Sequence, residues 1–534
     1  MSIAQRNYPS LIRPIVASHN RYWEEARPTM EKYRDVYGID FYRGDNKRDD
    51  LAIQVADANS FIEGYIASLF SKAPSVRIGE DVKASGGNEE VAEAIVNRFL
   101  LNQQETITNA ARLALIYPMA FLKIICSRAN DDEVLNKFSI AAIKPWDILL
   151  DMTAPDWDSQ RWVGHITSMP VNIANEKYGK KDWKPAPLKD YFSDTKLSTY
   201  EVKDLPDEFL YVQVIEFYDL INNKLVFWSP NWKNGDAPIE VLDIPVMDHD
   251  GSFMTPIIPL YLCSTPDAPL KGFSSLKKIY DQIREKNLIR THIAKAIRRD
   301  TRQVGYKEGA FDEESLAKLE GGLDNCFVPF KGDIDPRLAF AVIPNLALSS
   351  NYSVHLGLVE QDLARASVLA PFTRGEATRA TATEVTALVQ YTAAEIGKMA
   401  RARDSAIERL ARTYIRMIEA FLDEEDEKTV ILLDGKVHTV KASELDGKMR
   451  IFALDGGSMP LAKATQKAEL VSLIPILQAS GVPQDAILKG IVELFDLDGN
   501  LFKAAPPPPP MPPPVPNAPP VPGLPVDPLA KMGV

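Results

Sequence analysis

The sequence predicts an α+β protein that is mainly helical and contains one helix of unusual length. Three observations lead to this prediction. The N-terminal region has apolar residues at helical spacing, a run of short β-branched and aromatic segments follows Pro118, and an uninterrupted helical pattern extends from Thr381 to Glu424. At 534 residues, the chain is long enough for roughly three or four structural units.

The helical pattern after Thr381 is the strongest of these features. Thr381 and Glu384 have the spacing of a capping box, which predicts that a helix begins there. A helix of this length would be roughly 65 Å long. An ordinary long core helix or a coiled-coil arm would give the same pattern. Apolar residues recur at steps of three and four and their multiples, and no proline interrupts them: Val385, Leu388, Ile396, Met399, Leu410, Tyr414, Met417 and Phe421.

Composition limits the possible classes of protein. The net charge of -12 argues against a protein that coats nucleic acid over its whole surface. Three widely spaced cysteines without a CxxC motif suggest neither a disulfide framework nor a cysteine zinc site, and a reducing compartment fits best. The N-terminus lacks the apolar core of a signal peptide. The most apolar run, near Leu113 to Cys126, is interrupted by Pro118 and Lys123, so we expect no membrane span.

The N-terminal half predicts helices followed by strands. Residues 11–36, 51–72 and 91–115 have helical periodicity. After Pro118, the predicted strands are FLKIIC, NKFSIAAI, RWVGHITSM, EFLYVQVIEFYDL and KLVFWS, with a turn at Asn222-Asn223 between the last two.

The middle of the chain carries a local charge asymmetry. Lys271 to Lys307 holds eleven Lys and Arg against three acids. A helical projection places Leu276, Ile279, Ile283, Ile293 and Ile297 on one arc. The cations cluster on a different arc and comprise Lys277, Arg284, Lys295, Arg298, Arg299 and Arg302. This basic face is either a solvated surface or a surface that meets phosphates or an acidic neighbour.

The next two segments predict a small insert and a returning helix. Glu308 to Asn345 reverses the charge, with eight acids against three cations, and contains the short strand candidates NCFVPF and AFAVIP. Leu346 to Leu369 again has a helical pattern.

The C-terminal region predicts strands, two helices and a tail. TVILLDGKVHTV and MRIFAL have strand character, and residues 459–480 and 483–495 have helical character. From Ala504 onward, one short stretch holds fourteen of the 39 prolines, which predicts an extended polyproline segment.

No recognised pattern of enzyme chemistry is found. The sequence lacks GxxxxGK[ST], GxGxxG, HExxH and GxSxG motifs, and its six histidines are scattered. Asp147, Asp151, Asp156 and Asp158 would form a metal site only if they converged, and turn chemistry explains them as well. DLDGN has its glycine in the fourth position, where an EF-hand needs it in the sixth. We therefore predict no catalytic residue, metal or cofactor.

The order of parts resembles the portal proteins of tailed bacteriophages. The matching residues are PWDILLD with its downstream strand and NEKYG, and above all RGEATRATATEVTALVQYTAAEIGKMARARD. The resemblance covers about residues 10–455. It implies a ring, usually dodecameric, at one capsid vertex, with double-stranded DNA passing through a central channel.

The resemblance also implies a division of the chain into parts. The family's long helix spans its wing, and its crown is helical. The segments carried over are a wing (1–270, together with the long helix and strands at 381–455), stem helices (271–299 and 347–369), a clip (300–346), a channel loop (370–380) and a crown (456–503), followed by the proline-rich tail (504–534).

These parts carry implied roles. Arg374 and Arg379 of the channel loop would contact DNA phosphates without reading bases. The basic helix would pair with neighbouring subunits or face the capsid and DNA, and the clip would dock terminase and head–tail adaptors. The ring would sit in the virion against the major capsid protein, after assembly in the host cytoplasm. One alternative is a non-portal virion assembly protein, a scaffold or tail adaptor that recruits partners through its proline-rich tail. Another is an unfamiliar nuclease.

Overall fold

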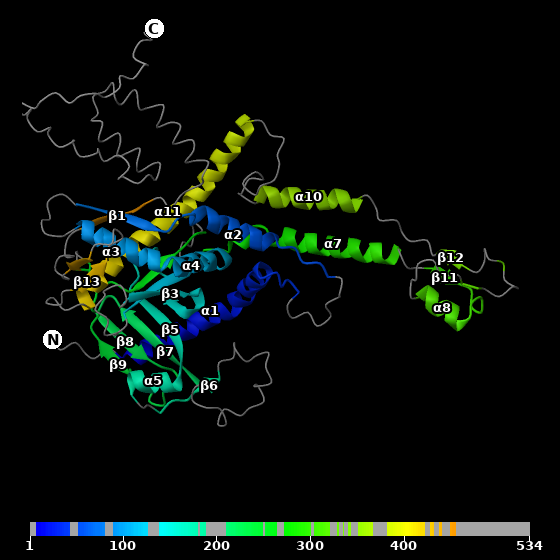
Figure 1. The fold of residues 1–534 in the computed structure, drawn as a ribbon. Helices are drawn as coiled ribbons and strands as arrows, with labels where there is room; N and C mark the ends of the chain where they lie inside the picture. The colour runs from blue at the N-terminus through cyan, green and yellow to red at the C-terminus, as the bar shows by residue number, and fades with distance from the viewer. Residues whose placement is uncertain are drawn as a thin grey trace, which may run out of the picture. The chain divides into compact units, whose positions relative to one another are not determined.

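A computed structural model of the chain (Figure 1) has a mixed α+β fold. About half of the described chain is helical and several antiparallel sheets are present, which confirms the predicted α+β class. The described residues are 7–42, 52–80, 89–126, 138–179, 182–187, 210–248, 251–263, 272–300, 304–320, 328–329, 335, 340–342, 351–366, 382–421, 428–431, 437–440 and 449–454.

Four helices begin the chain, and they confirm the helical prediction for this region. The side chain of Asn7 caps the first helix by accepting a hydrogen bond from the Ser10 amide at 3.3 Å. Two boundaries differ from the prediction. Residues 52–56 lie outside the helix, and the pattern over 91–115 is two helices that are separated at Gln103. The helices are α1 (Tyr8–Tyr37), α2 (Asp57–Leu69), α3 (Glu89–Asn102) and α4 (Gln104–Ile116).

Two antiparallel sheets follow, and all five strands predicted after Pro118 are present. The first sheet has the order β10-β2-β3, and the second has the order β4-β5-β7-β8-β9, with β6 pairing with β7. Asn223 adopts a positive φ of 52° at the predicted turn between β7 and β8. The strands are β2 (Ala120–Cys126), β3 (Phe138–Ile143), β4 (Ile148–Leu150), β5 (Trp162–Pro170), β6 (Ala186–Pro187), β7 (Leu210–Asp219), β8 (Lys224–Trp228), β9 (Glu240–Leu242) and β10 (Ile257–Leu260).

Helices cover both faces of the larger sheet. Ile12 of α1 packs in one apolar cluster with Ile215 and Phe217 of β7. Val214, one position away, lies in a cluster on the opposite face with Ala174 of helix α5 (Val171–Tyr178). Successive residues of a strand point to opposite faces, so β7 is buried on both sides and is central to this layer.

The later elements include the helices predicted from the middle of the chain. A 3₁₀ turn (Ser275–Lys278) precedes α7 (Tyr280–Asp300), and α10 (Asn351–Ala366) falls within the predicted 346–369 segment. The elements between them are β11 (Val304–Tyr306), α8 (Glu313–Glu320) and β12 (Phe340–Val342), with β11 paired to β12. The AFAVIP segment therefore contains the expected strand.

The longest described helix is α11 (Ala382–Phe421), with 40 residues, which confirms the predicted continuous helix. The strand predictions after it are also confirmed, and β15 pairs with β1, a strand that the sequence analysis did not identify. Both crown helices and the proline-rich tail lie outside the described residues. The remaining strands are β1 (Ser75–Glu80), β13 (Lys428–Ile431), β14 (Val437–Val440) and β15 (Met449–Leu454).

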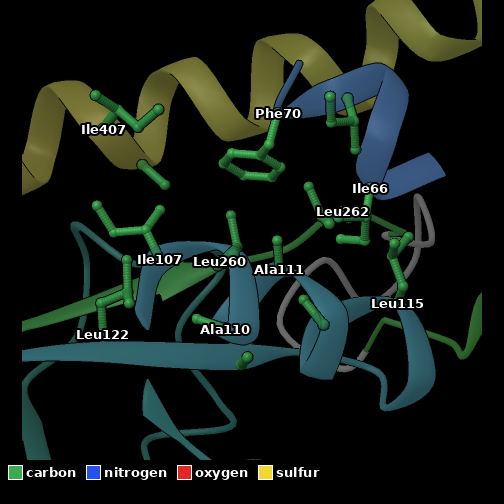
Figure 2. Close-up of a cluster of buried hydrophobic side chains, with 14 of the residues drawn as sticks. Ile66, Phe70, Ile107, Ala110, Ala111, Leu115, Leu122, Leu260, Leu262 and Ile407 are labelled. Atoms are coloured by element: carbon green, nitrogen blue, oxygen red, sulfur yellow. The ribbon is translucent and has the colours of Figure 1, made fainter. Parts of the chain in front are cut away.

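The main apolar core surrounds the C-terminal half of α11. Ile407 lies above a cluster that includes Phe70, which directly follows α2, and Ile107 of α4 (Figure 2). Tyr414 stacks on Phe99 of α3 with ring centroids 3.8 Å apart and an interplanar angle of 9°. Helix α11 is therefore held in the core by contacts from several helices and sheets.

Tyr414 provides a test of this packing. Its ring is fully buried, and its hydroxyl has no hydrogen-bond partner within the described part of the chain. We expect Tyr414→Ala to lower the free energy of unfolding by about 3–5 kcal/mol, because the cavity remains partly unfilled. Tyr414→Phe keeps the ring and removes an unpaired buried hydroxyl, so its stability should equal or exceed wild type. Urea unfolding measures both, and equal losses in the two variants would contradict the packing described.

Candidate functional surface

The basic helix predicted from the sequence is α7, and it is preceded by a capped 3₁₀ turn. The Ser274 hydroxyl accepts a hydrogen bond from the Leu276 amide at 3.2 Å, and Ser275 donates to the Leu115 carbonyl at 2.7 Å. Ile279 and Ile283 are buried in the main core. The start of α7 is therefore fixed to α4 and to the core.

One face of α7 binds the segment before α2, residues 52–56, through two polar side chains. The Val55 amide donates to Asn287 Oδ1 and the Ile53 amide donates to Thr291 Oγ1, both at 3.0 Å. Asn287 and Thr291 are both buried and are four residues apart, so they share one side of the helix. Neither residue was predicted from the sequence, although two polar residues four positions apart beside the apolar arc were a usable signal.

A second face of α7 packs against α10, and the two helices run antiparallel (Figure 1). Lys286 Nζ lies 2.9 Å from Asp57 Oδ2 and 3.4 Å from Glu360 Oε1, so this cation connects α7 with α2 and α10. Its side chain is only 13% exposed. His355 Nε2 of α10 lies 2.6 Å from Glu285 Oε1. Part of the basic surplus therefore holds the helices together and is not available to ligands.

The predicted basic residues are distributed as follows. Arg284 is exposed, and Lys295, which is half-buried, lies three turns further along the same side of α7. Lys277 is exposed but belongs to the 3₁₀ turn. Arg298 and Arg299 lie in the last turn of α7, where only the backbone is described, and Arg302, Arg374 and Arg379 lie outside the described residues. Helix α7 thus aligns Arg284 with Lys295.

A buried charged network lies where the two sheets meet. Lys123 of β2 places Nζ 2.5 Å from Glu216 Oε2 of β7 and 3.1 Å from His165 Nδ1 of β5. An ammonium group can only donate, so His165 Nδ1 is the acceptor and the imidazole proton is on Nε2. The network joins the three-stranded sheet to the six-stranded sheet.

The protonation of this network follows from its burial. Burial and the nearby Lys123 ammonium lower the pKa of His165 to about 3, so the ring is neutral at physiological pH. Burial alone would raise the pKa of Glu216, but the attraction of Lys123 holds it below its ordinary value. A neutral imidazole beside an ion pair could accept a proton in catalysis, but His165 lines neither of two pockets in the described part of the chain, one beside Trp162 and Phe217 and the other beside Trp228 and Trp232. Its evident role is to link the sheets.

The four aspartates considered as metal ligands do not converge. Asp151 accepts hydrogen bonds from Thr153 and from Arg161 Nε, at 2.5 Å for the latter. Asp158 forms a bidentate pair with Arg409 of α11. The others lie in turns: Asp147 in a 3₁₀ turn (Pro145–Asp147), and Asp156 accepting from the Ser159 amide at 2.8 Å. Over the described ranges, no cluster of three or more His, Cys, Asp or Glu could hold a metal ion.

Comparison with known proteins adds no relative. The sequence matches no model of a protein family, and a search of curated proteins gave no match. In the part of the chain that the structure describes, no helix combines the length and apolar character needed to cross a membrane.

The pKa of His165 predicts a specific pH dependence of stability. Its folded value of about 3 lies below the ordinary 6.5, so the unfolded chain binds one more proton between these values. The contribution of His165 to stability is complete above pH 6.5 and is lost as the pH falls toward 3, by about 1.4 kcal/mol per unit. We expect His165→Asn to remove this slope in urea unfolding measured from pH 7.5 to 4.5. The exposed control His292→Asn should keep it, and identical slopes in the two variants would contradict the assignment.

Proposed function

We propose that the protein is the structural subunit of a portal-type ring through which double-stranded DNA is packaged into a capsid and later ejected. The observation that carries the proposal is the order and packing of α7, the β11–α8–β12 insert, α10 and α11. Helix α7 leaves the core and is followed by a small mixed insert. Helix α10 returns antiparallel to α7, and a 40-residue helix follows. In this proposal α7 and α10 are the stem helices, the insert is the clip, and residues 370–380 are the channel loop.

The charges along the chain support the same assignment. The clip segment carries eight acids against three cations, which suits docking to terminase and to head–tail adaptors. Arg374 and Arg379 would bind the phosphates of the DNA. A phosphate contact is independent of base sequence, so it can be made at every position of a moving duplex. The other partner is the major capsid protein. The proposed ring subunit requires no metal, cofactor or catalytic group.

One feature favours a second candidate function. The stretch of fourteen prolines near the C-terminus is a composition typical of partner recruitment. The protein would then be a scaffold or tail adaptor in virion assembly.

The oligomeric state of the purified full-length chain tests the proposal. We expect electron microscopy to show closed rings with an open axial channel, because each subunit would contribute one sector. Native mass spectrometry should give one dominant assembly whose mass is a whole multiple of 59.4 kDa, with twelve copies as the expected number. Monomers, filaments or closed particles without a channel would contradict the portal assignment.

The channel-loop arginines make a second prediction. In phage carrying Arg374→Ala and Arg379→Ala together, we expect less DNA to be packaged or retained per particle, because the loop loses its contacts with phosphates. The matched control is Arg401→Ala with Arg412→Ala, which removes two exposed arginines from the middle and the C-terminal half of α11. DNA content per purified particle is the measurement. Unchanged packaging and retention in the loop variant would remove the arginines from the proposal.

A further inference from the structure

A pocket with a volume of about 390 Å³ lies between helix α1 and the loop that follows strand β8. The loop, residues 229–236, supplies one wall together with Lys184. The volume falls in the range of about 300–1,000 Å³ that is typical of ligand pockets. The wall from α1 consists of residues whose spacing places them on one side of the helix: Arg13, Val16, Ala17 and Asn20.

Hydrogen bonds hold the loop in place. Arg13 of α1 donates to the Gly235 carbonyl at 2.8 Å, and the indole of Trp228 donates to the same carbonyl at 2.9 Å. The side chain of Asn231 donates to the Lys184 carbonyl at 3.0 Å, and the Asn231 carbonyl accepts from the Lys184 amide at 2.6 Å. The walls are therefore fixed before a ligand binds, which lowers the entropic cost of binding.

The pocket offers two ammonium groups to a negatively charged ligand. Arg13 and Asp236 form an ion pair with each other at 2.7 Å. Lys184 is exposed and forms no ion pair within the described residues. Lys233 Nζ lies 3.6 Å from Asp182 Oδ2, and both side chains are more than half exposed, so this pair is weak. Lys184 and Lys233 are therefore available to an incoming anion.

The same pocket has an apolar part. The indole of Trp228 is 2% exposed, and Trp232 is half-buried. Val16 and Ala17 line the pocket from the α1 side. A matching ligand therefore has an apolar group next to its negative charge.

We propose that this pocket binds an acidic peptide segment of a partner protein, in which a carboxylate lies next to an aromatic or aliphatic side chain. The carboxylate pairs with Lys184 and Lys233, and the neighbouring side chain packs against Trp232 and Val16. The site is independent of the proposed ring, because no residue of α7, α10 or the channel loop lines it.

A nucleic acid strand fits this pocket less well than an acidic peptide. Asp236 is 87% exposed and Asp182 is 76% exposed, and both adjoin the cations. A strand carries a phosphate at every nucleotide, so these carboxylates would repel it. A peptide needs only one carboxylate at the lysines, and its backbone amides can donate to the exposed aspartates.

Selection from displayed random heptapeptides on the immobilised full-length chain tests the pocket. Ala17→Phe fills the space between the walls, and the control Ser18→Phe places the same side chain on α1 outside the lining. Both positions are exposed, so both variants should keep the wild-type melting temperature. We expect peptides that bind wild type and Ser18→Phe but not Ala17→Phe, and these should carry Asp or Glu next to an apolar residue. Finding no such peptides, or only basic or uncharged ones, would overturn the proposal.

Charge reversal tests the role of the two lysines. We expect Lys184→Glu with Lys233→Glu to raise the Kd of a selected, fluorescently labelled peptide at least about tenfold, because the carboxylate then meets like charges. The control Lys32→Glu with Lys398→Glu changes the net charge equally at two exposed lysines outside the pocket. Fluorescence anisotropy measures both variants, and equal Kd values would overturn the proposal. Labelled oligothymidylate is measured in parallel. Tighter binding of oligothymidylate than of the peptide, lost in Ala17→Phe, would identify a nucleic acid site instead and also overturn it.

Discussion

The burial of the C-terminal half of α11 is the constraint on which the rest of the described structure depends. Leu410, Ala411 and Tyr414 are fully buried. Arg403 is also enclosed and donates to the carbonyl of Leu69 at the end of α2, while its Nε binds Asp404 at 2.8 Å. An enclosed guanidinium is tolerated only with such partners, so this turn of α11 has a defined position against α2. Because a helix is stiff, fixing this half also fixes the direction in which the helix continues toward Ala382.

The same core also positions the basic helix. Asn287 and Thr291 supply acceptors to the backbone of residues 52–56, and Lys286 binds carboxylates on two other helices. Buried backbone amides require hydrogen-bond partners, so Asn287 and Thr291 determine the position of α7 as specifically as its buried isoleucines do. What remains for recognition is a narrower surface that contains Arg284, Leu288 and Lys295.

Local patterns in the sequence predicted most of the elements. The capping box and apolar spacing predicted α11, and short β-branched segments predicted strands β2, β3, β5, β7 and β8, because both signals are contained within one element. Features set by distant contacts were not predictable. Strand β1 pairs with β15 near the other end of the described chain, and residues 52–56 precede α2 without joining it, with the Ile53 and Val55 amides bonded to side chains of α7. Lys123, His165 and Glu216 come from three strands, and only their place in apolar segments hinted at a buried network. The sequence did identify the face that contains Arg284 and Lys295, but it did not show that Lys286 is used internally.

Photochemical cross-linking to DNA tests the central claim most directly, which is that the segment leading into α11 meets a duplex. A photoreactive amino acid would replace Arg374 or Arg379 in separate phage, and Arg412, which is exposed on the anchored half of α11, would be the comparison position. After irradiation of DNA-filled particles, we expect covalent protein–DNA adducts from positions 374 and 379 and none from position 412. Adducts from position 412 alone, or from none of the three positions in filled particles, would contradict the account.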